Sequence, residues 1–175
     1  FAQPFADSAY RHISRTLIKE HQNIHMSIIG KGSEENKINT YIRKHNLETV
    51  VELIPEMPRH QLLKMLSDAD IYFFPSLREG GSWALMEAMA VGLPVVCLNW
   101  TGMKIITDTN SAIQIEPNEY EQIKNGFTEG LGKLIIDREL RISMGSAARN
   151  RIKNLFNWEH VGDQFNRILN QYEMM

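Results

Sequence analysis

The sequence predicts an α/β fold built on a Rossmann-like, doubly wound parallel sheet. Short apolar runs of strand length alternate with longer helix-like segments, and this alternation is typical of βαβ units. The clearest unit runs from Ile71 to Leu98: a buried strand, a Gly-rich loop, an apolar helix and a second buried strand. Such a unit requires a right-handed crossover between parallel strands.

The first half of the chain is expected to supply three strands. A helix-like segment over residues 1–20 precedes the apolar run 25–29, which ends at the turn Gly30–Gly32. Ser33 is expected to cap the next helix, to about residue 45, because a serine oxygen can accept from free helix N–H groups. The second strand is expected over residues 49–54. A Pro-containing loop and a short helix over residues 59–67 lead to the third strand at 71–74.

The second half is expected to add two strands and several helices. An apolar helix from Trp83 to Val91 ends at Gly92 and Pro94, and the fourth strand follows at residues 95–98. A short helix over 103–107 precedes a fifth strand at 112–115. Three helices complete the chain, from about residue 118 to 134, from 137 to 155 and from 158 to 172. Asn118 and Asn157 are expected to cap the first and last of these three.

Composition fits one globular domain over residues 1–175. Hydrophobic residues make up 43% and charged residues 23% of the 175, which is ordinary globular usage. The net charge of -2 and the pI of about 6.3 show no basic excess, so nucleic acid is not an expected partner. No apolar run reaches membrane-spanning length, and a cytoplasmic setting is expected. The single cysteine, Cys97, is expected to be core filler.

Two glutamates with seven residues between them are the strongest candidates for chemistry. Glu79 lies in the polar, Gly-rich turn after the third strand, and Glu87 stands on a helix that is otherwise apolar from Trp83 to Val91. A carboxylate among apolar side chains is costly unless it is paired. The residues alone leave two partners open for Glu87: an Arg or Lys from elsewhere in the fold, or a ligand with hydroxyls such as a ribose or hexose.

The position of these glutamates in the fold favours a ligand. In doubly wound sheets, ligands bind outside the carboxyl ends of the strands, and the turns at Gly30, Pro55 and Glu79 are all expected at that edge. Gly80, Gly81 and Ser82 lead into a helix whose free N–H groups attract anions or sugar oxygens. Ser82 is interpreted as a helix cap or a ligand contact rather than a nucleophile, because the Gly-x-Ser-x-Gly pattern is missing.

Other motifs are better explained without special chemistry. Gly30-Lys31-Gly32 lacks the third glycine of a dinucleotide fingerprint, so a simple turn is the first interpretation and a turn beside a nucleotide the second. Asp68 and Asp70 precede a strand, where solvated acids or a helix-end cap are favoured over a metal site. His21 and His25 have no third ligand nearby, so no metal site is expected.

Several segments together resemble the donor-site signature of the GT4-type retaining glycosyltransferases, which have the GT-B fold. They are Ile28–Gly32, Ser67–Asp70, Pro75-Ser76, Glu79–Gly81, Glu87–Ala90, Gly92–Val95 and Phe156–Trp158. The paired glutamates match that family's E-x7-E element. The resemblance covers nearly the whole chain, which would be the C-terminal, nucleotide-sugar-binding half of such an enzyme.

The resemblance implies a role for each site residue. Glu79 would be the catalytic-site residue that hydrogen-bonds hydroxyls of the transferred sugar, and Glu87 would accept from the ribose diol. Backbone N–H groups of Gly81, Ser82 and Trp83, together with Gly80, would face the sugar and diphosphate. The loop at Glu56 and Met57 would border the nucleobase, and Gly30, Lys31 and Gly32 would line the nucleotide cleft. No cofactor and no metal ion would be needed. Two places stay open for the Trp83 side chain, the core or a position covering the donor sugar, and the core is favoured.

The resemblance also implies what lies outside this chain. A first strand, the diphosphate-gripping cations and an acceptor-binding N-terminal domain would precede Phe1, so these 175 residues alone are not expected to transfer sugar. The full protein would act in polysaccharide or glycoconjugate biosynthesis on a saccharide or lipid-linked acceptor, in the cytoplasm or at the inner face of the membrane. Two alternatives stay open: a non-catalytic nucleotide-binding module of the same fold, and a nucleotide-sugar epimerase.

Overall fold

The computed structural model describes residues 16–17, 21, 23–77 and 79–173. The helix expected over residues 1–20 therefore lies outside the described residues, apart from a helical stretch at Thr16 and Leu17. The strands are β1 (Met26–Ile29), β2 (Val51–Ile54), β3 (Tyr72–Phe74), β4 (Val95–Leu98) and β5 (Ala112–Ile115). The helices are α2 (Glu35–Lys44), α3 (Arg59–Asp68), α4 (Trp83–Val91), α5 (Thr101–Ile106), α6 (Tyr120–Ile136), α7 (Arg138–Leu155) and α8 (Trp158–Glu173).

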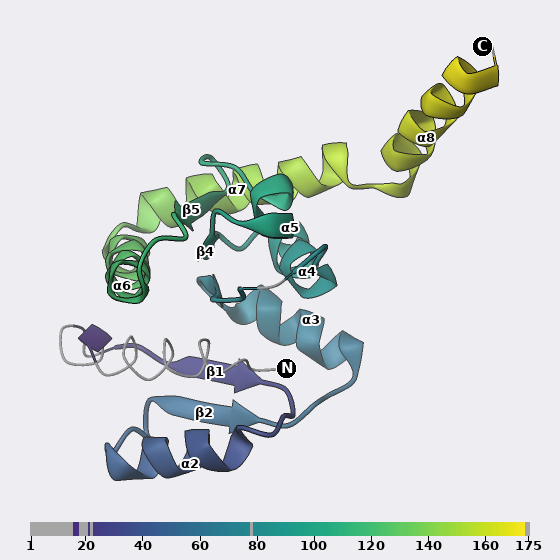
Figure 1. Ribbon diagram of the computed structural model, residues 1–175. Helices are drawn as coiled ribbons and strands as arrows, with labels where there is room; N and C mark the ends of the chain where they lie inside the picture. The colour runs from purple at the N-terminus through teal and green to yellow at the C-terminus, as the bar shows by residue number, and fades with distance from the viewer. Residues whose placement is uncertain (1–15, 18–20, 22, 78, 174–175) are drawn as a thin grey trace.

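The strands form two parallel sheets, one of β1 and β2 and one in the order β3-β4-β5. Figure 1 shows them as separate layers, with α2 against the smaller sheet and α3 leading to the larger one. The parallel α/β class is thus confirmed, but the described strands do not make one continuous sheet.

Helices cover the three-stranded sheet on both faces. Phe73, Val96 and Ile113 share one face, where Phe73 meets Phe127 of α6 edge-on at 5.1 Å between ring centroids. A Cβ on Gly130 of α6 would lie 3.0 Å from Ile113 and 3.2 Å from Val96, so α6 packs closely there. On the opposite face, Cys97 lies 3.7 Å from Thr107 Oγ1, just after α5. The sheet is therefore doubly wound, as the sequence predicts.

Helix caps confirm some predictions and correct others. Ser82 accepts from the amide of Leu85, and Asn157 accepts from the amide of His160, so both are side-chain caps. Ser33 and Asn118 are not caps: α2 and α6 begin one residue later, after Glu34 and Glu119, without a side-chain cap bond. These two ends are set by packing, through Ile38 of α2 and Ile123 of α6, which are both buried.

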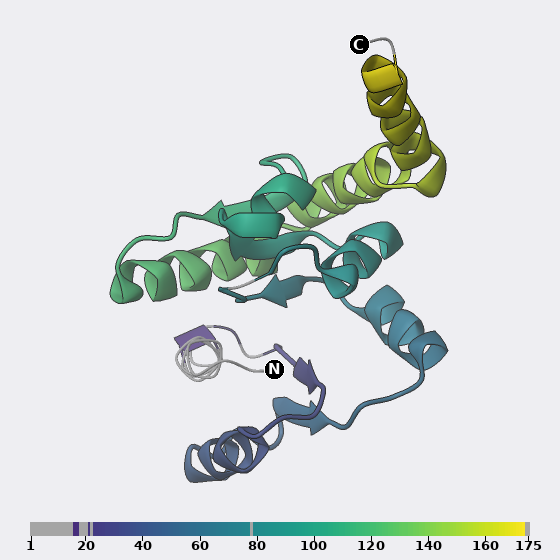
Figure 2. The same cartoon turned by 45° about the vertical axis from the view of Figure 1, so that its right-hand side comes forward.

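Helix α8 extends away from the rest of the molecule in both views (Figures 1 and 2). Its large apolar side chains Trp158, Val161, Phe165 and Ile168 recur at spacings of three and four residues, and all are exposed. They therefore form a stripe along one side of the helix. In the described part of the chain, no helix is both long and apolar enough to span a bilayer.

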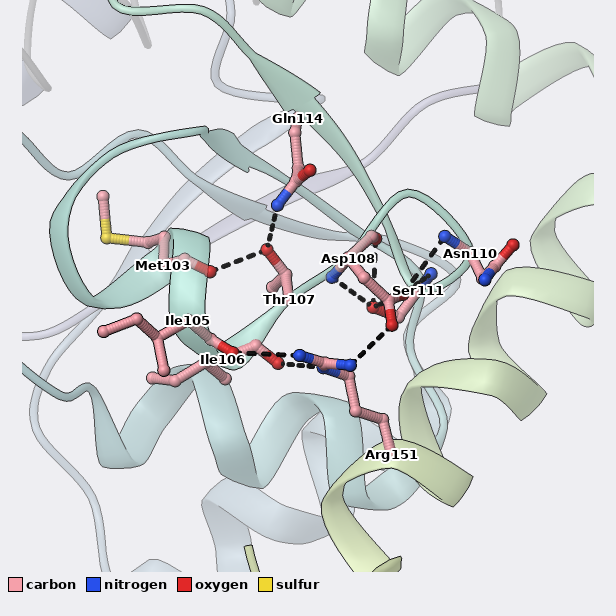
Figure 3. A network of polar contacts seen from close by, with 9 residues as sticks. All are labelled: Met103, Ile105, Ile106, Thr107, Asp108, Asn110, Ser111, Gln114 and Arg151. Carbon is pink, nitrogen blue, oxygen red and sulfur yellow. Dashed lines mark hydrogen bonds and ion pairs between the residues drawn. The ribbon is translucent and has the colours of Figure 1, made fainter. Parts of the chain in front are cut away.

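One arginine fastens the end of α7 to the loop between α5 and β5 (Figure 3). Arg151 donates to the carbonyl oxygens of Ile106 at 2.7 Å and Ile105 at 3.0 Å, and to Asp108 Oδ2 at 2.6 Å. Asp108 in turn accepts from the amide and the hydroxyl of Ser111. Burial alone would raise the pKa of Asp108, but these Ser111 bonds and the Arg151 charge outweigh it and lower that pKa.

Replacing Arg151 by Met should lower the free energy of unfolding by about 2 kcal/mol, because three charge-assisted bonds are lost. For a chain of this size, the melting temperature should fall by about 4–8 °C. The stabilisation from Asp108 is complete above the ordinary carboxyl pKa and is lost as pH falls through its lowered folded-state pKa, so the deficit of Arg151→Met should shrink in acid. Thermal unfolding between neutral pH and pH 3 measures both effects. Arg149→Met, an exposed change on the same helix, should have little effect; an equal loss there would refute the assignment.

Candidate functional site

The loop between β3 and α4 carries the first predicted site residue, Glu79. It is half-buried, and its Oε1 accepts from Ser76 Oγ at 3.3 Å, within the same loop. Gly80 and Gly81 follow and are exposed, and a Cβ added to either would meet nothing within 4 Å. Their backbone is therefore open to the approach of a ligand.

Helix α4 starts directly from this loop and places Glu87 about one turn after its first residue, Trp83. The buried Ser82 caps the helix, and Gly92 ends it in the left-handed conformation with φ of 98°. Leu85, Ala88 and Met89 are fully buried, so one side of the helix packs in the core. This packing fixes the direction in which Glu87 points, and it agrees with the predicted strand–loop–helix unit.

The structure supplies a protein partner for Glu87. Arg59 Nε, at the first position of α3, donates to Glu87 Oε1 at 2.6 Å. The Glu87 side chain is only 18% exposed, whereas that of Arg59 is 72% exposed. An arginine was one of the two partners left open, and 28 residues separate the pair. Because a carboxylate offers about four lone-pair sites, this bond leaves acceptor capacity at Glu87.

Tyr72 joins the two glutamates in one electrostatic environment. Its phenol is on β3, and burial together with the negative charges of Glu87 and Glu79 raises its pKa to about 12. Tyr72 therefore stays neutral and can donate a hydrogen bond at physiological pH. The sequence analysis did not identify Tyr72 or Arg59 as site residues. The only signal in the sequence was their position: Tyr72 is in the strand before the Glu79 loop, and Arg59 comes just after the loop that contains Glu56.

The predicted nucleotide turn lies in a different pocket. Gly30, with φ of 141°, donates its amide to Ile54 of β2 at 3.0 Å. The turn lines a small pocket whose other walls come from β1, β2 and α2; its lining residues are Ile28, Ile29, Gly30, Lys31, Gly32, Glu34, Glu35, Ile38 and Leu53. Lys31 is exposed at its rim. Neither glutamate of the α4 unit lines this pocket, so the two groups of predicted site residues are separate in this structure.

The remaining predicted residues are at or near the surface. Glu56 is exposed and Met57 is half-buried, in the loop that leads from β2 to Arg59. Because Arg59 binds Glu87, the end of this loop lies close to that glutamate. Trp83 is 66% exposed, and the prediction that it belongs to the core is wrong. Its ring instead lies 6.3 Å from that of Trp158. Helix α4 is apolar on all sides, so the sequence pattern could not indicate which residues face outward.

Ionisable groups elsewhere have structural roles. Cys97 is buried, and burial raises the pKa of its thiol to about 11, so it is core filler as predicted. His25 Nε2 lies 2.9 Å from Glu52 Oε1 on the neighbouring strand. Within the described ranges, no three His, Cys, Asp or Glu side chains gather in a way that could hold a metal ion.

Comparison with known proteins identifies the family. The model of group 1 glycosyl transferases matches residues 6–151. The chain belongs to this family. The match includes β1 to β5 and both glutamates, so it confirms the resemblance drawn from the sequence motifs.

Curated relatives of this family member include two that are named as biosynthesis glycosyltransferases. It is 33% identical over 149 residues to the amylovoran biosynthesis glycosyltransferase AmsK of Erwinia amylovora, covering 77% of this chain and 34% of AmsK. It is 26% identical over 171 residues to the capsular polysaccharide biosynthesis glycosyltransferase CapM of Staphylococcus aureus, covering 91% of this chain and 42% of CapM. The chain therefore spans well under half the length of these relatives.

Solved structures confirm the fold. Staphylococcus aureus TarM, crystallised with UDP and alpha-GlcNAc-glycerol, matches with a TM-score of 0.77 at 23% identity, covering 93% of this chain and 32% of TarM. The pneumococcal O-GlcNAc transferase GtfA, in complex with UDP and GlcNAc, matches with a TM-score of 0.76 at 20% identity, covering 93% of this chain and 32% of GtfA. This group 1 chain thus has the Rossmann-like fold of half a GT-B enzyme.

Proposed function

We propose that this chain is the donor-binding domain of a GT4-type retaining glycosyltransferase that moves a sugar from a nucleotide-sugar to an acceptor. The observation that carries the proposal is the β3–α4 unit. Within it, Glu79 stands in an open Gly-rich loop, Glu87 is held about one turn into α4, and the half-buried Tyr72 phenol is influenced by both carboxylates. Hydroxyl-rich ligands are recognised by such fixed, partly buried acceptors.

In this proposal each glutamate serves a different part of the donor. Glu79 accepts from hydroxyls of the transferred sugar, and Glu87 accepts from the ribose diol while retaining its bond from Arg59. Amides of Gly81, Ser82 and Trp83 at the start of α4 stabilise the diphosphate through the helix N-terminus. Glu56 and Met57 border the base, and Gly30, Lys31 and Gly32 line the cleft. The reaction needs no metal ion or other cofactor.

The exposed stripe of α8 supports the view that this domain works beside another one. Four large apolar side chains on one helix face, with Trp83 next to Trp158, form more apolar surface than scattered exposed residues would. We assign the acceptor-binding part of the longer protein as what covers this stripe, since the relatives are more than twice as long as the segment matched here. The acceptor is a saccharide or lipid-linked saccharide, met in the cytoplasm or at the inner membrane face.

A thermal-shift screen tests the donor class. UDP-, GDP- and ADP-glucose, with the free diphosphates, should be added to the purified chain, because a ligand that binds only the folded state raises its melting temperature. The diphosphate of one base should raise the melting temperature most, and the glucose conjugate of that base should raise it further. No shift with any of the six compounds at millimolar concentration would contradict the proposal.

A further inference from the structure

Helix α5 starts in direct contact with the backbone that carries Glu79. The amide of Gly102, its second residue, donates to the main-chain carbonyl of Glu79 at 2.8 Å. Gly102 is buried. A Cβ added there would lie 2.7 Å from the Glu79 carbonyl oxygen and closer still to that of Gly80. Real Cβ atoms do not approach backbone oxygens this closely, so only glycine fits.

Both ends of α5 are fixed. At its C-terminal end, Arg151 binds the carbonyl oxygens of Ile105 and Ile106 (Figure 3). At its start, Thr101 has a φ of 49°, which is unfavourable for a β-branched residue and persists only where surrounding contacts impose it. The helix is therefore held against the Glu79–Gly80 peptide rather than resting there loosely.

The Glu79 loop has few other supports among the contacts found in the described structure. Its side-chain bond from Ser76 is long, at 3.3 Å, and a side chain placed on Gly80 or Gly81 would find no neighbour within 4 Å of its Cβ. The position of the carboxylate thus depends on its main chain. A displacement of about 1 Å in a reacting or binding group can cost about a hundredfold in rate.

We propose that Gly102 is a positioning residue for Glu79: its missing side chain lets α5 hold the Glu79–Gly80 peptide in place. It does not touch the donor in this account. The consequence for sugar binding rests on the proposed function, but the positioning itself does not, so the two can be tested apart.

The test uses Gly102→Ala and, for comparison, Gly145→Ala. A Cβ on Gly145 would collide equally with a backbone oxygen, that of Gly92, where α7 crosses the end of α4. Gly132→Ala, which meets nothing within 4 Å, serves as the unhindered change. Hydrogen exchange of peptides covering residues 77–83 is measured for each variant at the same interval below its melting temperature.

Gly102→Ala should speed exchange in this loop about tenfold or more, because a local opening becomes easier, and Gly145→Ala should not. If Gly102→Ala does not fold, NMR exchange on the unaltered chain replaces it, where the Gly102 amide should be protected well above that of Gly81. Unchanged loop exchange in Gly102→Ala, or an unprotected Gly102 amide, would overturn the proposal.

Calorimetry then tests whether the position of Glu79 affects binding of the nucleotide-sugar. Gly102→Ala should weaken binding of the best glucose conjugate among UDP-, GDP- and ADP-glucose about tenfold, and that of the matching free diphosphate far less. Equal weakening of both would overturn the assignment to Glu79. If the unaltered chain binds none of the six compounds, the proposed function fails, while the exchange result still decides the role of Gly102.

Discussion

Glu87→Gln should weaken binding of the nucleoside diphosphate about tenfold or more, because a hydrogen bond to a charged acceptor is worth about 1.5–3 kcal/mol. The substitution keeps the shape of the side chain and removes its charge. Glu87 is assigned to the ribose, which the free diphosphate and the nucleotide-sugar share, so both ligands should lose affinity to a similar extent. Calorimetric titration at a temperature where the variant is folded measures the effect.

Arg59→Gln is the natural comparison for this substitution. It breaks the same 2.6 Å ion pair but leaves the carboxylate in place. Because Arg59 is largely exposed, its loss should cost less than about 1 kcal/mol of stability and affect affinity less than Glu87→Gln does. If Glu87 serves only as the partner of Arg59, both variants should melt at lower temperature by the same amount and bind the diphosphate like the unaltered chain. That pattern would refute the ribose assignment.

Glu79→Gln should have the opposite selectivity. Affinity for the free nucleoside diphosphate should be unchanged, whereas affinity for its sugar conjugate should fall about tenfold, since Glu79 is assigned to the sugar hydroxyls. In the full-length enzyme, kcat should fall more than nucleotide affinity, because contacts to the reacting sugar strengthen in the transition state. Titration of both ligands and steady-state kinetics measure these effects.

Ser76→Ala separates the carboxylate of Glu79 from its support. This change removes the 3.3 Å hydrogen bond and keeps the charge. It should lower sugar-conjugate affinity by less than Glu79→Gln does. A loss of diphosphate affinity in Glu79→Gln as large as that of the sugar conjugate would show that the two glutamates do not divide the donor as proposed.

Local structure was largely predictable from the sequence. The bounds of α4, β4 and β5 agree with the expected segments, because glycine, proline and apolar runs mark these ends locally. Ser82 and Asn157 were recognised as caps for the same reason. Ser33 and Asn118 were not caps, although their residue types suit the role, because buried contacts one turn further on decide where those helices begin.

Contacts between distant segments could not be predicted in this way. The partner of Glu87 comes from 28 residues away, and nothing in the local pattern distinguishes Arg59 from other exposed cations. The exposure of Trp83 was missed because a helix that is apolar on all sides gives no directional signal. The division of the strands into two sheets likewise depends on pairing across the chain, which short-range patterns do not contain.

A crystal structure with the best-binding nucleotide-sugar from the screen tests the central claim most directly. We expect at least one ribose hydroxyl to lie within about 3 Å of the Glu87 carboxylate, with the sugar against Glu79 and the diphosphate at the start of α4. A nucleotide seated in the pocket beside Gly30 and α2, with neither glutamate in contact, would contradict it.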